Sequence, residues 1–416
     1  MTEPLVDSAA DVSSGIAAFP MARASGCPFD PPPALRELQA EGAFAKVRLW
    51  DGSTPWVVTR HADQRALLSD PRISADPTQS GFPYWDSAQC TRGKEAQSRI
   101  PLFEMDDPEH ARLRRMVSAH LTAKRVEALR PAIQRIADTL IDAMLEGPKP
   151  VDLVEAFALP LPSLVICELL GVPYDDHEFF QENSVIFGTR GAPPEATAAA
   201  RDKLTDYLDG LIGDKLADPG NDMLSRVAVE RVATGELPRA DLAQLAWILL
   251  HAGHETTTNM IALGTLALLE HPDQLAQLRG TDDSKLIAGA VEELLRYLHI
   301  NQVGRRRVAT EDIEHDGHLI RAGDGLVFAL DVGDRDESVF PDPDRLDVHR
   351  DARQHVAFSF GVHQCLGQQL ARVELQVIYS TLYRRIPGLR LATELADVPF
   401  KHDAFNYGVH QLLVTW

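Results

Sequence analysis

Residues 355–367 read His-Val-Ala-Phe-Ser-Phe-Gly-Val-His-Gln-Cys-Leu-Gly, and a helical segment follows directly. The stretch places Cys365 near the N-terminus of a helix, where the helix dipole and unpaired N–H groups stabilise a thiolate. Gly361 permits a tight turn with positive φ, and Gly367 leaves room for a flat ligand close to the backbone. Phe358 is placed to shield the sulfur from water. A single cysteine is more often an ordinary buried side chain, but this spacing of Gly, His, Cys and Gly favours a ligand.

Outside this stretch, the pattern predicts one large helix-rich domain with small sheets. Helices are expected near residue 34, after Asp107-Pro108, over residues 151–170, 238–270 and 287–298, and from Cys365 to about Arg385. Two strands are expected at Ala45–Leu49 and Trp56–Thr59, joined by a turn at Asp51-Gly52. No linker divides the 416 residues, so we expect a mainly α fold (α+β), with residues 1–25 as a flexible arm and residues 26–416 as a single domain.

The composition excludes several classes of protein. Lys and Arg number 41 and Asp and Glu number 61, so the formal net charge is −20, whereas a general nucleic-acid binder needs a basic surface. No run approaches the ~18 to 20 apolar residues of a transmembrane helix, and Met1 to Gly15 lacks the features of a signal peptide. The 4 cysteines are far apart, which favours a reducing compartment. We therefore expect a cytoplasmic protein that binds neither nucleic acid nor membrane.

Polar residues interrupt the longest apolar helix at its centre. Residues 252–257 read Ala-Gly-His-Glu-Thr-Thr, between the apolar runs Leu245–Leu250 and Met260–Leu263. Ala252 and Thr256 lie one turn apart and share a face. Small residues there would let the helix approach a bound planar group, so the segment is a candidate wall of a ligand site rather than a polar turn facing solvent.

Zinc binding is an alternative interpretation of the same segment. The candidate zinc ligands would be His251, His254 and Glu255. Their spacing is not that of a His-Glu-x-x-His helix, whose two histidines lie at i and i+4, so zinc is disfavoured. No role follows for His254.

Two further pairs lie at helical spacing. Glu293 and Arg296 are at i and i+3, a common ion pair worth only ~0.2 to 0.5 kcal/mol on a helix surface. His110 and Arg114 are at i and i+4, so they share a face that is suited to a carboxylate. Taken alone, either pair is more often a solvated helix face.

The pattern Phe358-x-x-Gly361-x-His363-x-Cys365-x-Gly367 resembles the haem-binding signature of the cytochrome P450 superfamily at every position. The resemblance spans about residues 25 to 416. It implies that Cys365 is the thiolate ligand of the iron of haem b (iron protoporphyrin IX), whose electron donation favours O–O cleavage. It also implies the triangular P450 fold, with the haem between the long distal helix and the helix that follows the cysteine loop.

The same resemblance assigns roles to residues of the other motifs. Glu255 would be the acid of a proton relay and Thr256 the hydroxyl that steadies dioxygen, with Ala252 and Gly253 close to the haem. The haem propionates would be held by basic side chains from several segments, namely His110, Arg114, Arg307 and His363. The family's ion-pair cluster beneath the haem would comprise Glu293, Arg296 and Arg350.

The function that the resemblance implies is that of a haem-thiolate monooxygenase. It would hydroxylate or epoxidise a medium-to-large organic substrate, such as a macrolide, polyketide or terpenoid, with O2 and electrons from NAD(P)H. The 416 residues hold no flavin or iron–sulfur domain, so electrons would arrive through ferredoxin reductase and ferredoxin, and a monomer is expected. The alternatives are a nitric-oxide-reductase-like enzyme of the same fold and a non-enzymatic haem-binding or small-molecule-sensing protein. Both can do without the acid–threonine pair, which is intact here as Glu255-Thr256.

The resemblance also locates two surfaces. The substrate walls would fall at Phe82–Leu102, Phe187–Thr197, Ile248–Ala252, Ile300–Val303 and Phe405–Tyr407, with Trp85, Phe187, Trp247, Phe405 and Tyr407 as aromatic candidates. A basic patch on the cysteine side would steer an acidic ferredoxin, and its candidates are Arg112, Arg115, Lys124 and Arg372.

Overall fold

The computed structural model describes residues 16–24, 26–87, 89–90, 101–188, 193–402 and 404–416. Its larger helices are α1 (Pro33–Glu41), α2 (His61–Leu68), α4 (Glu109–Ser118), α5 (Ala123–Glu127), α6 (Arg130–Glu146), α7 (Pro160–Leu170), α8 (His177–Gly188), α9 (Pro194–Ala217), α10 (Met223–Val227), α11 (Arg239–Glu270), α12 (Pro272–Leu278), α13 (Ser284–Leu298), α14 (Leu330–Gly333) and α15 (Gln368–Arg385). Its strands are β1 (Phe44–Lys46), β2 (Trp56–Val58), β3 (Ile73–Ser74), β4 (Val151–Asp152), β5 (Arg305–Ala309), β6 (Ile313–His315), β7 (His318–Ile320), β8 (Gly325–Phe328), β9 (Arg390–Leu391) and β10 (Leu413–Thr415). The mainly α fold with small sheets is confirmed.

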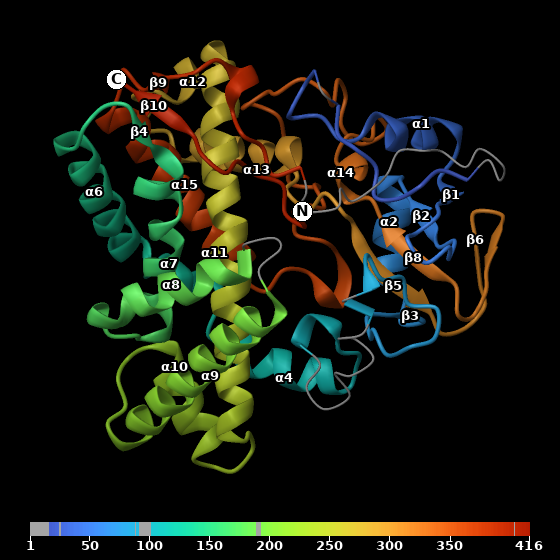
Figure 1. The fold of residues 1–416 in the computed structure, drawn as a ribbon, viewed down its shortest axis with the longest axis horizontal. Helices are drawn as coiled ribbons and strands as arrows, with labels where there is room; N and C mark the ends of the chain where they lie inside the picture. Colours follow the sequence, from blue (N-terminus) through green and yellow to red (C-terminus); the bar gives the residue numbers. More distant parts are fainter. Residues whose placement is uncertain (1–15, 25, 88, 91–100, 189–192, 403) are drawn as a thin grey trace.

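Helix α11 is the axis of the helix-rich half of the molecule (Figure 1). Its 32 residues span about 48 Å at 1.5 Å per residue, and every residue from Thr257 to Leu268 is buried. It packs against α7, α9, α13 and α15. At Gly264 an added Cβ would lie 1.8 Å from the hydroxyl of Tyr379, which donates to the Met260 carbonyl at 2.6 Å. This close approach holds α15, the helix after the cysteine loop, directly against α11.

The largest sheet occupies the other half, beside α1, α2 and α14 (Figure 1). Its strand order is β1-β2-β8-β5-β3, with β2 parallel to β8 and the other pairs antiparallel. In β5, Arg305 pairs with Phe328 and Arg307 with Leu326 of β8. Alternation along β5 thus places Arg305 and Arg307 on one face of the sheet and Arg306 on the other.

Two sequence predictions need correction. Residues 16–24, expected to belong to a loose arm, pack onto the sheet half: the Phe19 N–H donates to the Arg48 carbonyl at 2.9 Å, and the Phe19 ring lies 5.3 Å from that of Trp85. Residues 1–15 lie outside the described residues. The helix expected over residues 151–170 is replaced at its start by strand β4, because Val151–Asp152 pairs with β10; a π-helical turn, Val154–Ala158, then leads into α7 (Pro160–Leu170).

The boundaries of the remaining helices are close to those expected. The long helix runs over Arg239–Glu270, and the helix with the Glu-x-x-Arg pair runs over Ser284–Leu298. Within the described residues, no helix combines the length and the apolarity that crossing a bilayer requires.

Candidate functional site

The cysteine loop is held by local hydrogen bonds and by close packing. The Cys365 N–H donates to the Phe358 carbonyl at 2.9 Å, and the Gln364 N–H donates to the Gly361 carbonyl at 3.0 Å. Gly361 has φ 74°, and an added Cβ there would lie 2.2 Å from the Leu68 carbonyl oxygen. The tight turn with positive φ is therefore confirmed. Helix α15 starts at Gln368, so the turn places Cys365 just before the first residue of the helix.

The Cys365 sulfur lies on the wall of an internal space. Its side chain is exposed, yet burial raises the pKa of the thiol, opposed by the Gly367 N–H and by the cations Arg305 and Arg114. Solvent access deep within a protein means that the group borders a cavity rather than the outer surface. An added Cβ on Gly367 would meet no atom within 4 Å, so this space continues over the helix start.

Helix α11 forms a second wall of the site. Ala252 is exposed although it lies in the middle of the longest helix, and Thr256 one turn later is half-buried. The Thr256 hydroxyl donates to the Ala252 carbonyl at 2.7 Å. Gly253 faces elsewhere: an added Cβ would lie 2.8 Å from Ile166 Cδ1 of α7. The small residue at 253 thus serves helix packing, and approach to a planar group stays a prediction for Ala252.

The four basic side chains expected at the propionates are brought together from three segments. We call His110, Arg114, Arg307 and His363 the cationic cluster. The His110 and His363 rings lie 4.2 Å apart, and Arg114 Nη2 donates to the Gln364 carbonyl at 2.5 Å. Burial lowers the pKa of His363 to about 3, and the nearby Arg307, His110 and Arg114 add to this effect.

The cationic cluster fits a ligand with two carboxylates. His110 Nε2 and His363 Nδ1 are buried without a hydrogen-bond partner. In the described part of the chain, the carboxylate bonded to the cluster is Asp107, at 3.1 Å from His110 Nδ1. Buried donors and cations without acceptors are costly. The two propionates of a haem would supply the missing acceptors, and a solvent-accessible cysteine beside them would supply the axial sulfur.

Sequence reasoning missed the residues that surround Glu255. Asn406 Nδ2 donates to Glu255 Oε2 at 3.3 Å, and Lys401 Nζ donates to Asn259 Oδ1 at 3.0 Å. Burial raises the pKa of Glu255, while Lys401, Asn406 and Asn259 oppose the rise. Asn259 lies one helical turn after Glu255 and its position could have been noticed. Lys401 and Asn406 come from the C-terminal hairpin that is closed by the antiparallel bridge between Phe400 and Val409, more than 140 residues away, and no local pattern marks them.

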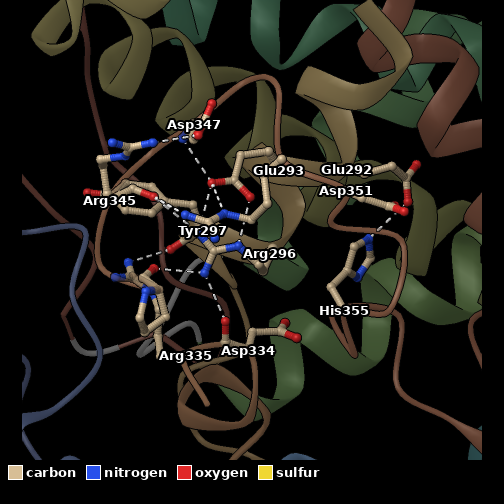
Figure 2. A network of polar contacts seen from close by, with 12 residues as sticks. Glu292, Glu293, Arg296, Tyr297, Asp334, Arg335, Arg345, Asp347, Asp351 and His355 are labelled. Carbon is tan, nitrogen blue, oxygen red and sulfur yellow. Dashed lines mark hydrogen bonds and ion pairs between the residues drawn. The ribbon is translucent and has the colours of Figure 1, made fainter. Parts of the chain in front are cut away.

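The Glu-x-x-Arg pair is the centre of a buried network (Figure 2). Arg296 and Glu293 form two hydrogen bonds of 2.7 and 2.8 Å, and both side chains are 0% exposed. Arg350 Nε donates to Glu293 Oε1 at 3.2 Å, so Arg350 is confirmed as the third member. Arg296 Nη1 also donates to the carbonyls of Asp334 and Pro343. The network ties α13 to the irregular segment that precedes the cysteine loop.

Two expected substrate-wall residues serve packing instead. Trp85 is buried against Phe19 and the guanidinium of Arg306. Tyr407 is 1% exposed, beneath the guanidinium of Arg23 at 4.1 Å. The prediction that these two rings face substrate is therefore wrong, since a wall residue would be accessible from the cavity.

The other wall residues and the two helix histidines have varied surroundings. Phe405 is exposed, the segment 189–192 lies outside the described residues, and the same holds for the side chain of Phe187. The Trp247 and His251 rings are stacked 5.5 Å apart. The His254 side chain lies beside the Leu159 backbone, and burial lowers its pKa to about 4.

On the cysteine side, α4 and the cysteine loop enclose a groove of about 330 Å³, and its lining includes Arg114, Arg115, Val362 and Gln364.

The four residues expected to form the basic patch for ferredoxin differ in their charge environment. Arg112 donates to Glu109 at 2.6 and 2.9 Å, and Arg372 donates to Glu292 at 2.7 and 3.0 Å. Arg115 and Lys124 are exposed. The charges of two of the four are thus locally neutralised.

Comparison with known proteins gives consistent matches. The family model described as "Cytochrome P450" matches residues 195–386. Cytochrome P450 GfsF of Streptomyces halstedii is 56% identical over 100% of both chains. The crystal structure of GfsF superposes with a TM-score of 0.90 at 55% identity, covering 96% of this chain and 100% of that one. The mycinamicin VIII C21 methyl hydroxylase MycCI of Micromonospora griseorubida, solved with mycinamicin VIII bound, gives a TM-score of 0.88 at 40% identity, covering 96% and 100%.

Proposed function

The chain belongs to the cytochrome P450 family and is a monooxygenase of that family, and from this premise we propose that it oxidises a medium-to-large natural product at a haem held by Cys365. The observation that carries the proposal is the accessible Cys365 sulfur at the edge of a cationic cluster whose buried donors have no acceptors. MycCI, 40% identical, acts on mycinamicin VIII. This supports hydroxylation of a comparably large substrate here.

The residues of the site divide into those that hold the haem and those that handle protons. Cys365 would ligate the iron, and the cationic cluster would bind the propionates, with Gly367 leaving space for the ring and Phe358 shielding the sulfur. Haem, when bound, supplies the iron at which O2 is reduced and the substrate is oxidised. Phe358 is suited to its role because it is buried, with the Arg372 guanidinium 4.6 Å above its ring.

Thr256 and Glu255 would move protons toward the oxygen. Because the Thr256 hydroxyl donates to the Ala252 carbonyl, its lone pairs remain free to accept a hydrogen bond from a water molecule. Burial raises the pKa of Glu255, which brings the carboxyl closer to the working pH and makes it a better proton carrier. Asn406 and Lys401 orient that carboxyl on the side of α11 that faces the C-terminal hairpin.

Electrons would come from NAD(P)H through ferredoxin reductase and ferredoxin, with ferredoxin docking on the cysteine side. Arg115 and Lys124 are the best candidates for this contact because their charges are exposed, whereas Arg112 and Arg372 are paired with Glu109 and Glu292. An acidic partner meets a protein of net charge −20, so docking must use a local basic patch. We also propose that the enzyme acts as a cytoplasmic monomer.

The carbon monoxide spectrum tests the haem assignment. Reduced protein under carbon monoxide should show the red-shifted Soret band of thiolate ligation. Cys365→Ala should abolish this band, whereas Cys27→Ala, a half-buried cysteine distant in sequence, should retain it. A Cys365→Ala protein that kept the band would refute the assignment.

A further inference from the structure

The carboxylate of Glu292 on α13 holds one side chain of the cysteine loop and one of α15. Arg372 of α15 donates through Nε to Glu292 Oε1 at 2.7 Å and through Nη2 to Oε2 at 3.0 Å. In the loop, the Ala357 N–H donates to His355 Nδ1 at 3.1 Å, so a neutral ring carries its proton on Nε2. His355 Nε2 then donates to Glu292 Oε2 at 3.1 Å (Figure 2). One carboxylate, 11% exposed, thus anchors both side chains.

Both anchored side chains adjoin the same aromatic ring, that of Phe358. The Arg372 guanidinium lies 4.6 Å from the centre of this ring, and the His355 ring lies 5.7 Å from it. Arg372 Nη1 also donates to Gln368 Oε1 at 2.8 Å, so each of the three guanidinium nitrogens is engaged. A guanidinium held over an aromatic face attracts the ring electrostatically. The position of the Phe358 ring therefore depends on two groups that share the Glu292 anchor.

Phe358 is joined directly to the cysteine that we propose as the iron ligand. The Cys365 N–H donates to the Phe358 carbonyl at 2.9 Å, and Phe358 is 9% exposed. A hydrophobic shell around a metal-bound sulfur keeps water away, whereas a water molecule at the sulfur would donate a hydrogen bond to it. Such bonds and solvent access change the reduction potential of the metal. A displaced Phe358 ring would therefore raise the potential, because water would stabilise the additional negative charge of the reduced site.

The charges of the anchor act little on the sulfur, so its geometry decides its effect. Burial acts to raise the pKa of Glu292, but hydrogen bonds from His355 and Arg372 outweigh it and lower the pKa to about 2. The carboxylate is therefore ionised and compensates the charge of Arg372 at close range. A pair without net charge has a weak field at a distance. Its main effect on the sulfur is then the place in which it holds the ring.

We propose that Glu292 is a positioning residue, which anchors Arg372 and His355, fixes the Phe358 ring and thereby keeps the reduction potential of the bound haem low. The inference rests on the proposed ligation of haem by Cys365. It adds a residue of α13, 73 positions before the cysteine, to the groups that set the properties of the sulfur.

Substitutions that conserve every charge test the inference. Glu292→Asp is one methylene too short to reach both partners, and Arg372→Lys lacks the planar fork. The readout is the ratio of reduced to oxidised haem at a fixed electrode potential, in haem-loaded protein whose folding is verified by circular dichroism. A hydrogen bond to a charged group changes an equilibrium by about tenfold or more, and part of this distinguishes the two oxidation states. The ratio should therefore rise about three- to tenfold in each variant.

Matched controls come from an exposed ion pair of the segment before the loop. Asp351 and Arg353 have side chains 66% and 78% exposed, and Asp351→Glu and Arg353→Lys should leave the ratio unchanged. The double variant Glu292→Asp with Arg372→Lys should shift the ratio no further than either single change, because the two residues act as one unit. If either variant fails to retain haem, His355→Gln takes its place. It keeps a donor but removes the ring beside Phe358, and the same rise is expected.

Four outcomes would overturn the inference. They are an unchanged ratio, a fall in the ratio, an equal rise in the control variants, and additive shifts in the double variant. Lower stability toward urea with an unchanged ratio belongs to the first of these, since Glu292 would then have a purely structural role. Failure of the proposed function is a separate result, because the native protein itself would then lack the carbon monoxide band of a thiolate-ligated haem.

Discussion

Replacing Arg296 with methionine should destabilise the protein by about 5 kcal/mol. The change leaves the Glu293 carboxylate, which is 0% exposed, with the Arg350 guanidinium and the Asp347 N–H at 3.0 Å. Breaking a buried ion pair by removing one partner costs about 3 to 5 kcal/mol of stability. Because Arg350 and the Asp347 N–H still contact Glu293, we expect a cost near the lower end of this range. The carbonyls of Asp334 and Pro343 also lose donors at 2.9 and 2.8 Å, at about 1 kcal/mol each.

Urea unfolding of the haem-loaded protein, followed by circular dichroism and by the Soret band, measures this cost. Arg353→Met is the control, because its ion pair with Asp351 has side chains 78% and 66% exposed and should contribute about 0 to 1 kcal/mol. Arg296→Lys should fall between the two, since lysine keeps the charge but has three donors on one atom. If the free energies of unfolding of Arg296→Met and Arg353→Met differed by less than about 1 kcal/mol, the buried network would not stabilise the protein as predicted.

Three further outcomes follow from the site. Thr256→Ala should uncouple turnover, with NAD(P)H consumed and hydrogen peroxide released, and unchanged coupling would remove the hydroxyl from the mechanism. Lys401→Gln removes a group that lowers the pKa of Glu255, so the alkaline limb of coupled turnover should move to higher pH, while Lys401→Arg should keep it in place; a shift to lower pH would contradict this. Arg115→Glu should slow reduction by ferredoxin more than Arg112→Glu does, because Arg112 is already paired with Glu109, and raised salt should slow the native rate. Peroxide-driven turnover, which needs no partner, should be spared in both variants.

The C-terminal hairpin that carries Lys401 and Asn406 packs closely against α11 beside Glu255. Asn259 of α11 donates through Nδ2 to the Asn406 carbonyl at 3.5 Å, and an added Cβ on Gly408 would lie 2.1 Å from Asn259 Oδ1. The hairpin therefore approaches α11 closely enough to fix the Lys401 ammonium beside the acid. Substitution at Gly408 should displace the hairpin and perturb Glu255 without touching the haem side of the helix.

The sequence by itself determined the parts of this protein that depend on short spacing. Cys365, Gly361 and Phe358 lie within eight residues of one another, and the Cys365 N–H bond to the Phe358 carbonyl closes the loop between them, so its role can be inferred from residue types. The same holds for Glu293 and Arg296, which one helical turn brings together wherever the helix lies. The long helix was likewise evident from the absence of a helix breaker between Pro238 and His271-Pro272, and its polar centre from residue types.

Only the tertiary structure decided which of these side chains have partners. Gly253 was expected near a planar ligand, but the packing of α7 against α11 turns it toward Ile166. Of three successive arginines in β5, the pairing with β8 sends Arg306 to Gln89 and leaves Arg305 exposed. Lys401 reaches Asn259 from 142 residues away. Such contacts depend on how distant elements pack. The local sequence determines which side chains share a face of a helix or strand, but it does not determine which element packs against that face.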